Sequence, residues 1–197
     1  MPEITKNTEQ CGSCEIHYLE AGKPGKRDIL LLHGKKFNAR TWQELGTLKV
    51  LAQCGYRAAA VDMPGYGNSP EGDMSPGQVL KSFISQREYD RPIVVGPSMG
   101  GRISLEFCLN NPDQIGGLVL VGSVGIEENR ERLSQIKVPT LIVWGEKDAI
   151  SPIVNGHTLN EKIEGSSFVV IQDAPHPCYL DKPDIWHWEL THFLETV

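Results

Sequence analysis

The stretch Ile93-Val94-Val95-Gly96-Pro97-Ser98-Met99-Gly100 decides the fold, because a short apolar run there meets a helix-like segment over residues 99–110. A Gly-x-Ser-x-Gly pattern at such a junction is typical of a nucleophile elbow, in which the serine occupies the apex of a sharp, strained turn. Residues two positions to either side must then be nearly free of side chain, and Gly96 and Gly100 satisfy this demand. The pattern predicts that the Ser98 hydroxyl stands clear of the sheet and attacks carbonyl carbon.

Two later strand ends carry the residue types that activate a serine. Asp148 comes shortly after the apolar run 139–144, and His176 comes shortly after the apolar run 168–171. Taken singly, each residue also has a purely structural interpretation. Ser98 is in a position typical of a helix cap, Asp148 is in a position typical of a cap on the next helix, and His176 is typical of a loop residue. The carboxyl ends of parallel strands meet at one edge of a sheet, so the three together predict a triad. His176 would take the Ser98 proton and return it to the leaving group, while Asp148 fixes the imidazole tautomer.

An upstream loop predicts the oxyanion hole. The apolar run 29–32 ends at His33-Gly34-Lys35, and a His-Gly turn after a buried strand commonly supplies one oxyanion donor. The expected donors are the backbone amides of Lys35 and of Met99, the residue after the nucleophile. His33 itself is expected to be structural and to bond across its loop. Three neighbours are expected to contact the substrate: Phe37, Pro97 and Cys178.

Composition predicts a folded globular protein with one core. The chain has 197 residues, of which 40% are hydrophobic and 22% charged. A net charge of −6 argues against nucleic acid as a partner. No apolar run approaches the roughly 18 residues that span a bilayer, and the first residues lack a signal-peptide core. We therefore expect no membrane partner and a cytoplasmic location, while the oligomeric state is left open.

The cysteines predict neither a disulfide framework nor a metal site. There are five, an odd number without a secretory signal, which indicates reduced thiols. Cys11-Gly12-Ser13-Cys14 is a C-x-x-C sequence, but no second pair completes a zinc site. We interpret it as a turn between two N-terminal strands. No metal and no resident cofactor are predicted.

Strand-like and helix-like segments alternate along the chain. This alternation predicts an α/β fold with a mostly parallel sheet, helices on both faces, and a single domain over residues 1–197. The strands are expected at 15–19, 29–32, 58–61, 93–95, 118–121, 141–143 and 168–171. The helices are expected at 39–53, 76–88, 99–110, 129–135, 152–163 and 184–195.

The connection after the strand at 118–121 is too short for a cap domain. About a dozen residues, 125–137, separate it from the next strand. The site should therefore be shallow and open, which suits short acyl groups and admits water.

Several local sequences resemble one known family. Asp62-Met63-Pro64-Gly65-Tyr66-Gly67-Asn68-Ser69 is similar to a structural turn of the α/β-hydrolase superfamily. Nearly the whole chain resembles the α/β-hydrolase domain-containing protein 14 family, most specifically over residues 41–48 and 176–187, and in having Pro97 before the nucleophile. The resemblance implies the α/β-hydrolase fold without a cap domain and Ser98, Asp148 and His176 as the triad. It also implies protein-lysine deacetylation as an activity proposed for relatives.

Three functional hypotheses follow. The first is a serine hydrolase that acts on short-chain, acetyl-type esters or amides through an acyl-enzyme. The second is an acetyl-lysine deacetylase, with coenzyme A as a candidate acyl acceptor; Lys35 and Lys36 would then steer its phosphates to the site. The third is a non-catalytic binding protein on a hydrolase scaffold.

Overall fold

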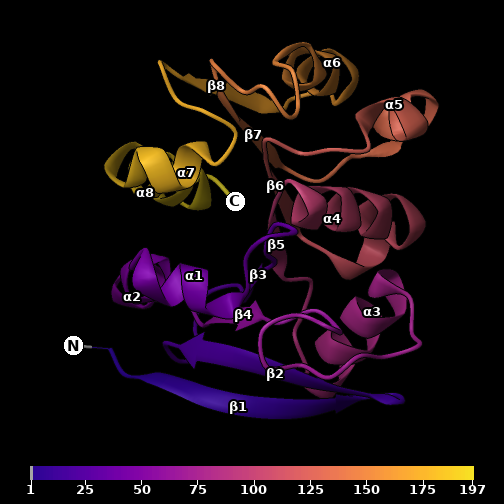
Figure 1. The fold of residues 1–197 in the computed structure, drawn as a ribbon, viewed down its shortest axis with the longest axis vertical. Coiled ribbons are helices and arrows are strands. Elements are labelled where there is room, and N and C mark those ends of the chain that lie inside the picture. Colours follow the sequence, from indigo (N-terminus) through magenta and orange to yellow (C-terminus); the bar gives the residue numbers. More distant parts are fainter. Residues whose placement is uncertain (1) are drawn as a thin grey trace.

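One eight-stranded sheet organises the chain. The computed structural model describes residues 2–197. The strands lie in the spatial order β1-β2-β4-β3-β5-β6-β7-β8 (Figure 1). Strands β3 to β8 pair in parallel, and β1 and β2 add an antiparallel hairpin at one edge. Their bounds are β1 Ile4–Cys11, β2 Cys14–Ala21, β3 Ile29–Leu31, β4 Ala58–Val61, β5 Ile93–Pro97, β6 Gly117–Val121, β7 Thr140–Gly145 and β8 Ser167–Ile171.

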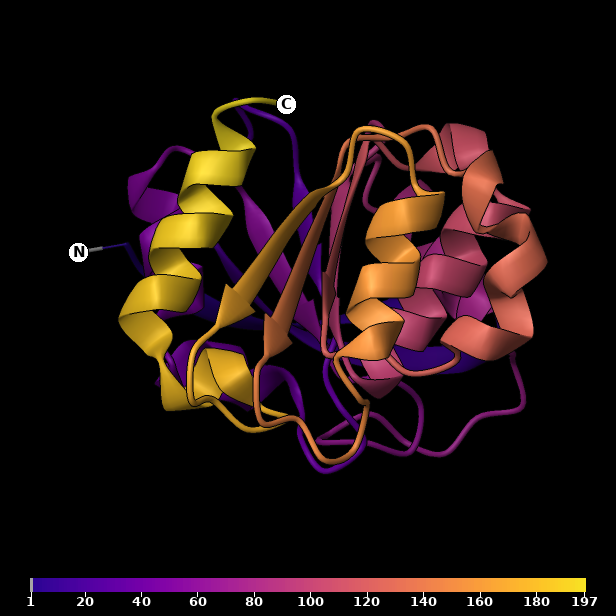
Figure 2. The same ribbon diagram turned by 90° about the horizontal axis from the view of Figure 1, so that it is seen from above.

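Helices cover both faces of this sheet, as the sequence predicts. Figures 1 and 2 place α1, α2, α7 and α8 on one side and α3, α4, α5 and α6 on the other. The first group comprises α1 Ala39–Glu44, α2 Thr47–Gln53, α7 Cys178–Asp181 and α8 Pro183–Leu194. The second comprises α3 Pro76–Gln86, α4 Met99–Asn110, α5 Ile126–Asn129 and α6 Val154–Lys162, with the 3-10 turns η1 Pro112–Gln114 and η2 Arg130–Gln135.

The central strands are apolar throughout because both of their faces are buried. Along β3, Leu30 packs into the core beside α3 and α4, whereas Ile29 and Leu31 pack into the core beside α2 and α8. Strands β5 and β6 alternate in the same way. This two-sided burial explains why the sequence shows continuous apolar runs rather than alternation.

The structure corrects the sequence prediction at three helices. The helix expected at 39–53 is two helices, α1 and α2, because Gly46 takes a left-handed φ of 88° between them. The helix expected at 129–135 is a short α5 followed by η2. The turn α7, directly after His176-Pro177, was not predicted. Cys11 and Cys14 flank the turn of the β1–β2 hairpin, as expected. They lie opposite each other in the strand register, and both are free cysteines.

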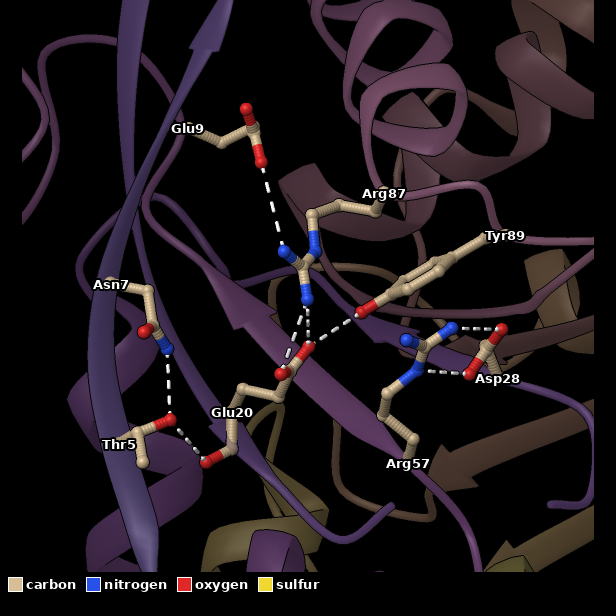
Figure 3. Close-up of polar contacts among 8 residues, drawn as sticks. All are labelled: Thr5, Asn7, Glu9, Glu20, Asp28, Arg57, Arg87 and Tyr89. Carbon is tan, nitrogen blue, oxygen red and sulfur yellow. Dashed lines mark hydrogen bonds and ion pairs between the residues drawn. The ribbon is translucent and has the colours of Figure 1, made fainter. Parts of the chain in front are cut away.

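A polar cluster fastens the N-terminal hairpin to the parallel sheet (Figure 3). The Arg87 guanidinium donates to Glu20 at 3.1 Å, and the Tyr89 hydroxyl donates to the same carboxylate at 3.0 Å. Beside them, Arg57 makes two hydrogen bonds to Asp28, at 2.6 and 2.8 Å. The contacts of Glu20 tie β2 to the segment after α3, whereas the Arg57–Asp28 pair joins the residues just before β3 and β4.

Only short elements lie between β6 and β7 in the described chain. Residues 122–139 contain α5 and η2, and no separate cap domain stands over the carboxyl ends of the strands. No helix within residues 2–197 is both long enough and apolar enough to cross a bilayer.

Candidate active site

Ser98 sits at the strained junction between β5 and α4. Its backbone has φ 52° and ψ −114°, a conformation that costs a non-glycine residue free energy and is typical of functional turns. A Cβ atom at Gly96 would lie 2.3 Å from the Gly100 carbonyl oxygen, and one at Gly100 would lie 2.8 Å from the His33 carbonyl oxygen. Both positions therefore require glycine, which is the physical content of the sequence pattern.

Asp148 and His176 meet at the carboxyl ends of β7 and β8. The Asp148 Oδ2 to His176 Nδ1 distance is 2.7 Å, and the Asp148 side chain is fully buried. The other oxygen, Oδ1, accepts the backbone N–H groups of Ile150 and Ser151, both at 2.8 Å. Three hydrogen bonds thus orient this carboxylate in a site shielded from water.

The bond to Asp148 determines which nitrogen of His176 is free. A carboxylate only accepts, so Nδ1 carries a proton, and in the neutral imidazole Nε2 then presents a lone pair. Nε2 is buried and has no hydrogen-bond partner among residues 2–197. Both His176 and Ser98 line one cavity. The imidazole is therefore in the tautomer that can accept a proton from a nucleophile in this cavity.

Gly122 is a site residue that sequence reasoning missed. It follows β6 directly and has a positive φ of 50°. A Cβ atom here would lie 3.1 Å from Asp148 Oδ2 and 3.3 Å from His176 Nδ1. The signal in the sequence was a glycine immediately after a buried strand, where a close approach is common.

The cavity above Ser98 has a volume of about 570 Å³. Phe37 and Pro97, both expected to contact substrate, line it. The expectation for Cys178 is not met: its side chain is fully buried in the core, and its neighbours Pro177 and Tyr179 line the cavity instead. Burial raises the pKa of the Cys178 thiol to about 12, so this cysteine is an inert core residue.

The wall of the cavity is mainly apolar and carries no carboxylate. It is made by Gly34, Lys35, Lys36, Phe37, Pro97, Ser98, Met99, Arg102, Val121, Val124, Ile150, His176, Pro177 and Tyr179. Arg102 is paired with Glu106 at 2.7 Å and with Glu128 at 3.5 Å. Lys35 and Lys36 are exposed and have no acidic partner within 4.0 Å among residues 2–197.

The loop after β3 lies directly beside Ser98. A Cβ atom at Gly34 would be 3.6 Å from the Ser98 Cβ, and Lys35 follows on the cavity wall. Met99 is the first residue of α4, where backbone N–H groups have no partner within the helix. The two expected oxyanion donors thus belong to segments that border the same cavity.

His33 is structural. Its Nε2 accepts the Met63 N–H at 3.1 Å and its Nδ1 lies 3.0 Å from the Gly34 carbonyl oxygen, to which it donates. Burial lowers the pKa of this histidine, which keeps it neutral. Its ring also packs on Tyr66, with 4.9 Å between centroids. The residue links two loops and does not line the cavity.

The Asp62–Ser69 turn is structural as well. Asp62 accepts backbone N–H groups from Ala39 at 2.6 Å and from Asn68 at 2.9 Å. The Ser69 hydroxyl donates to the Asp62 carbonyl oxygen at 2.7 Å. These bonds anchor the start of α1 and so help to place the loop that ends at Phe37.

Within residues 2–197, no group of three or more His, Cys, Asp or Glu side chains is arranged to hold a metal ion.

Comparison with known proteins agrees with this architecture. Residues 23–131 match the model of the family described as serine aminopeptidase, S33. The chain is 36% identical to the rat protein named "Putative protein-lysine deacylase ABHD14B", with 98% of this chain and 97% of that protein covered. It is 37% identical to zebrafish protein ABHD14A, with 84% of this chain and 63% of that protein covered.

Solved structures show the same fold at lower sequence identity. A protein from Thermoplasma acidophilum described as a predicted CIB-like hydrolase superposes with a TM-score of 0.96 at 23% identity, with both chains fully covered. A 2-hydroxy-6-oxo-6-phenylhexa-2,4-dienoate hydrolase from Rhodococcus superposes with a TM-score of 0.88 at 18% identity, covering 99% of this chain and 100% of that one. At these identities the likeness shows the fold alone.

Proposed function

This chain belongs to the ABHD14 family of α/β hydrolases, and on that premise we propose that it is a serine hydrolase that removes short acyl groups from esters or amides. Ser98 is the nucleophile, His176 the base and Asp148 the residue that orients the base. Asp148, His176 and the Ser98 elbow come from three strand ends of one sheet, where open α/β folds build their sites.

A single observation carries the proposal. The His176 imidazole is held by Asp148 at 2.7 Å and has an unpartnered, buried Nε2 among the described residues, while Ser98 occupies a strained turn on the same cavity. A scaffold without catalysis would have no need to combine an oriented base with a strained serine. Strain and an unsatisfied buried nitrogen each cost free energy, and they persist together where chemistry uses them.

The reaction follows from these positions in two steps. Ser98 Oγ bonds to the carbonyl carbon while its proton passes to His176 Nε2, and the negative oxygen is stabilised by the Met99 and Lys35 amides. Cleavage of the bond to the leaving group gives the acyl-enzyme, and the leaving group takes the proton from Nε2. Water then attacks the carbonyl carbon of the acyl-enzyme and gives a proton to Nε2. Nε2 returns this proton to Ser98 Oγ as the bond between Oγ and the acyl carbon breaks, which releases the acid and regenerates Ser98 and the neutral imidazole.

The acyl group is expected to be short because no cap encloses the site. Each methylene that a closed apolar pocket buries contributes about 0.8 kcal/mol, and an open cavity provides only part of that. Acetyl esters should therefore have a higher kcat/KM than octanoyl esters. A kcat/KM that rises steadily to long chains would contradict this part of the proposal.

A second candidate function is removal of acetyl groups from lysine, favoured by the name of the rat relative. The apolar cavity wall with two free lysines at its edge fits an acceptor that carries phosphates, such as coenzyme A, in place of water. An acetyl-lysine peptide assayed with and without coenzyme A distinguishes acyl transfer from hydrolysis.

The decisive experiment is labelling with a fluorophosphonate. The wild-type protein should be labelled at Ser98, and Ser98→Ala should lose both labelling and ester turnover by about 10⁴-fold or more. Ser85→Ala, at an exposed serine on α3, is the control and should retain both. Labelling that persists in Ser98→Ala would overturn the assignment of the nucleophile.

A further inference from the structure

Ile150 is an apolar side chain left in solvent at the edge of the catalytic cavity. Four large apolar side chains are strongly exposed in the described chain: Ile150, Val154, Ile185 and Trp188. Of these, Ile150 alone lines the cavity above Ser98, and 68% of its surface is exposed. Because Ile150 is part of the mainly apolar wall of this cavity, a ligand seated in the cavity would cover it.

The Ile150 backbone is fixed rather than free. Its N–H donates to Asp148 Oδ1 at 2.8 Å, and the next residue, Ser151, donates to the same oxygen at 2.8 Å. The Ser151 hydroxyl also donates to the Ser123 carbonyl oxygen at 2.7 Å. The backbone at Ile150 therefore loses little conformational entropy when a ligand packs on this residue.

The hydrogen bonds also place the Ile150 backbone next to the Asp148–His176 pair. Asp148 binds Ile150 through Oδ1 and His176 through Oδ2, so the isoleucine and the base share one carboxylate. In the proposed reaction, the leaving group takes its proton from His176 and so departs on the side of the base. The acyl group remains attached to Ser98 and needs no contact on that side.

We propose that Ile150 binds the leaving group, and that this group carries an apolar stem of several carbons. The inference rests on the proposed function and adds to it the chemistry of the alcohol or amine. Alkyl alcohols, alkyl amines and the four-carbon stem of an acylated lysine all have this chemistry. Lys35 and Lys36 also line the wall and, unlike Arg102, have no acidic partner among residues 2–197; they come from the loop after β3 and not from the loop that holds Ile150.

The test varies the leaving group and the acyl group separately. One arm compares butyl acetate with methyl acetate, and the other compares methyl butanoate with methyl acetate, each as a ratio of kcat/KM. Both ratios are measured for the wild type, Ile150→Ser and Val154→Ser by titrating released acid. Val154, at the start of α6, is 60% exposed but does not line the cavity, so it controls for loss of surface apolarity.

Ile150→Ser should lower the butyl-to-methyl ratio of the acetates about fivefold, the equivalent of about 1 kcal/mol. The butanoate-to-acetate ratio should stay within twofold, and Val154→Ser should change neither ratio. The proposal is overturned if the acetate ratio is unchanged, if the butanoate ratio falls instead, or if Val154→Ser has the same effect. Wild-type protein without Ser98-dependent turnover of any of these esters would refute the proposed function itself, and the inference with it.

Discussion

Replacing Gly122 with alanine tests whether kcat depends on the exact geometry of the contact between Asp148 and His176. The added Cβ would stand 3.1 Å from Asp148 Oδ2 and 3.3 Å from His176 Nδ1, closer than carbon normally approaches either atom. The Asp148 carboxylate cannot retreat freely because its other oxygen accepts two backbone N–H groups. His176 or the β6 end must therefore move by a few tenths of an ångström.

The size of the effect follows from this displacement. A misplacement of 1 Å in a catalytic group costs about 10²-fold in rate, so a shift of a few tenths should lower kcat about tenfold. KM should stay within twofold, since Gly122 does not line the cavity. Alanine at a positive φ also destabilises the fold by about 1 kcal/mol, which lowers Tm by about 2–4 °C in a chain of this size.

A second glycine separates the catalytic cost from the backbone cost. Gly46 has a φ of 88°, and a Cβ atom there would meet nothing within 4 Å. Gly46→Ala should lower Tm by a similar amount and leave kcat within twofold of wild type. Steady-state kinetics and thermal melts of both variants decide the matter. If kcat of Gly122→Ala matches that of Gly46→Ala, the reasoning from the close contact is refuted.

Three further predictions concern the charges around the site. Asp148→Asn should fold but lose about 10⁴-fold in kcat. The oxygen of its amide keeps the contacts to the backbone, but its nitrogen donates to His176 and so reverses the imidazole tautomer. Retained activity would contradict the role of Asp148. Replacing Lys35 and Lys36 with Gln should lower kcat/KM for an anionic thioester but not for a neutral acetate, and the difference should shrink in salt. Equal effects on both substrates would make these lysines ordinary surface residues. Burial lowers the pKa of His33 in the folded protein, so this histidine binds a proton more readily in the unfolded chain. The contribution of His33 to the free energy of unfolding should therefore be complete above about pH 6.5 and fall below that pH. The Tm difference between pH 7.5 and 5.5 should be smaller in His33→Asn, and an unchanged difference would exclude this histidine as the cause.

The sequence predicts the parallel sheet well, and also the strand ends at which Ser98, Asp148 and His176 stand, because these signals are local. Each of Ser98, Asp148 and His176 follows a buried apolar run, and parallel strands bring such positions to one edge whatever the details of packing. The sequence could not predict that Asp148 and His176 would lie 2.7 Å apart, nor that Gly122 would limit their approach. Those are distances between segments far apart in the chain, and no local pattern encodes them.

The errors have a similar origin. The sequence predicts one long helix through Gly46 because helical periodicity continues on both sides of it, whereas the φ of 88° at Gly46 separates α1 from α2. Cys178 was expected in the cavity because it lies two residues from His176. The turn α7 begins at Cys178 and directs its side chain into the core beside α8, which leaves Pro177 and Tyr179 on the wall. Proximity in sequence does not determine which face of a turn a side chain takes.

The two hydrogen-bonding oxygens of Asp148 join the chemistry of the site to its selectivity. Oδ2 binds His176, the proposed base, and Oδ1 binds the backbone of Ile150 on the cavity wall. A substitution that rotates the carboxylate would therefore change both the orientation of His176 and the surface offered to a leaving group. Ile150→Ser alters only the second, because the backbone N–H that Asp148 binds is retained. Chain-length selectivity and the orientation of the base should consequently separate at residue 150 and remain coupled at residue 148, where loss of the whole carboxylate would disturb both.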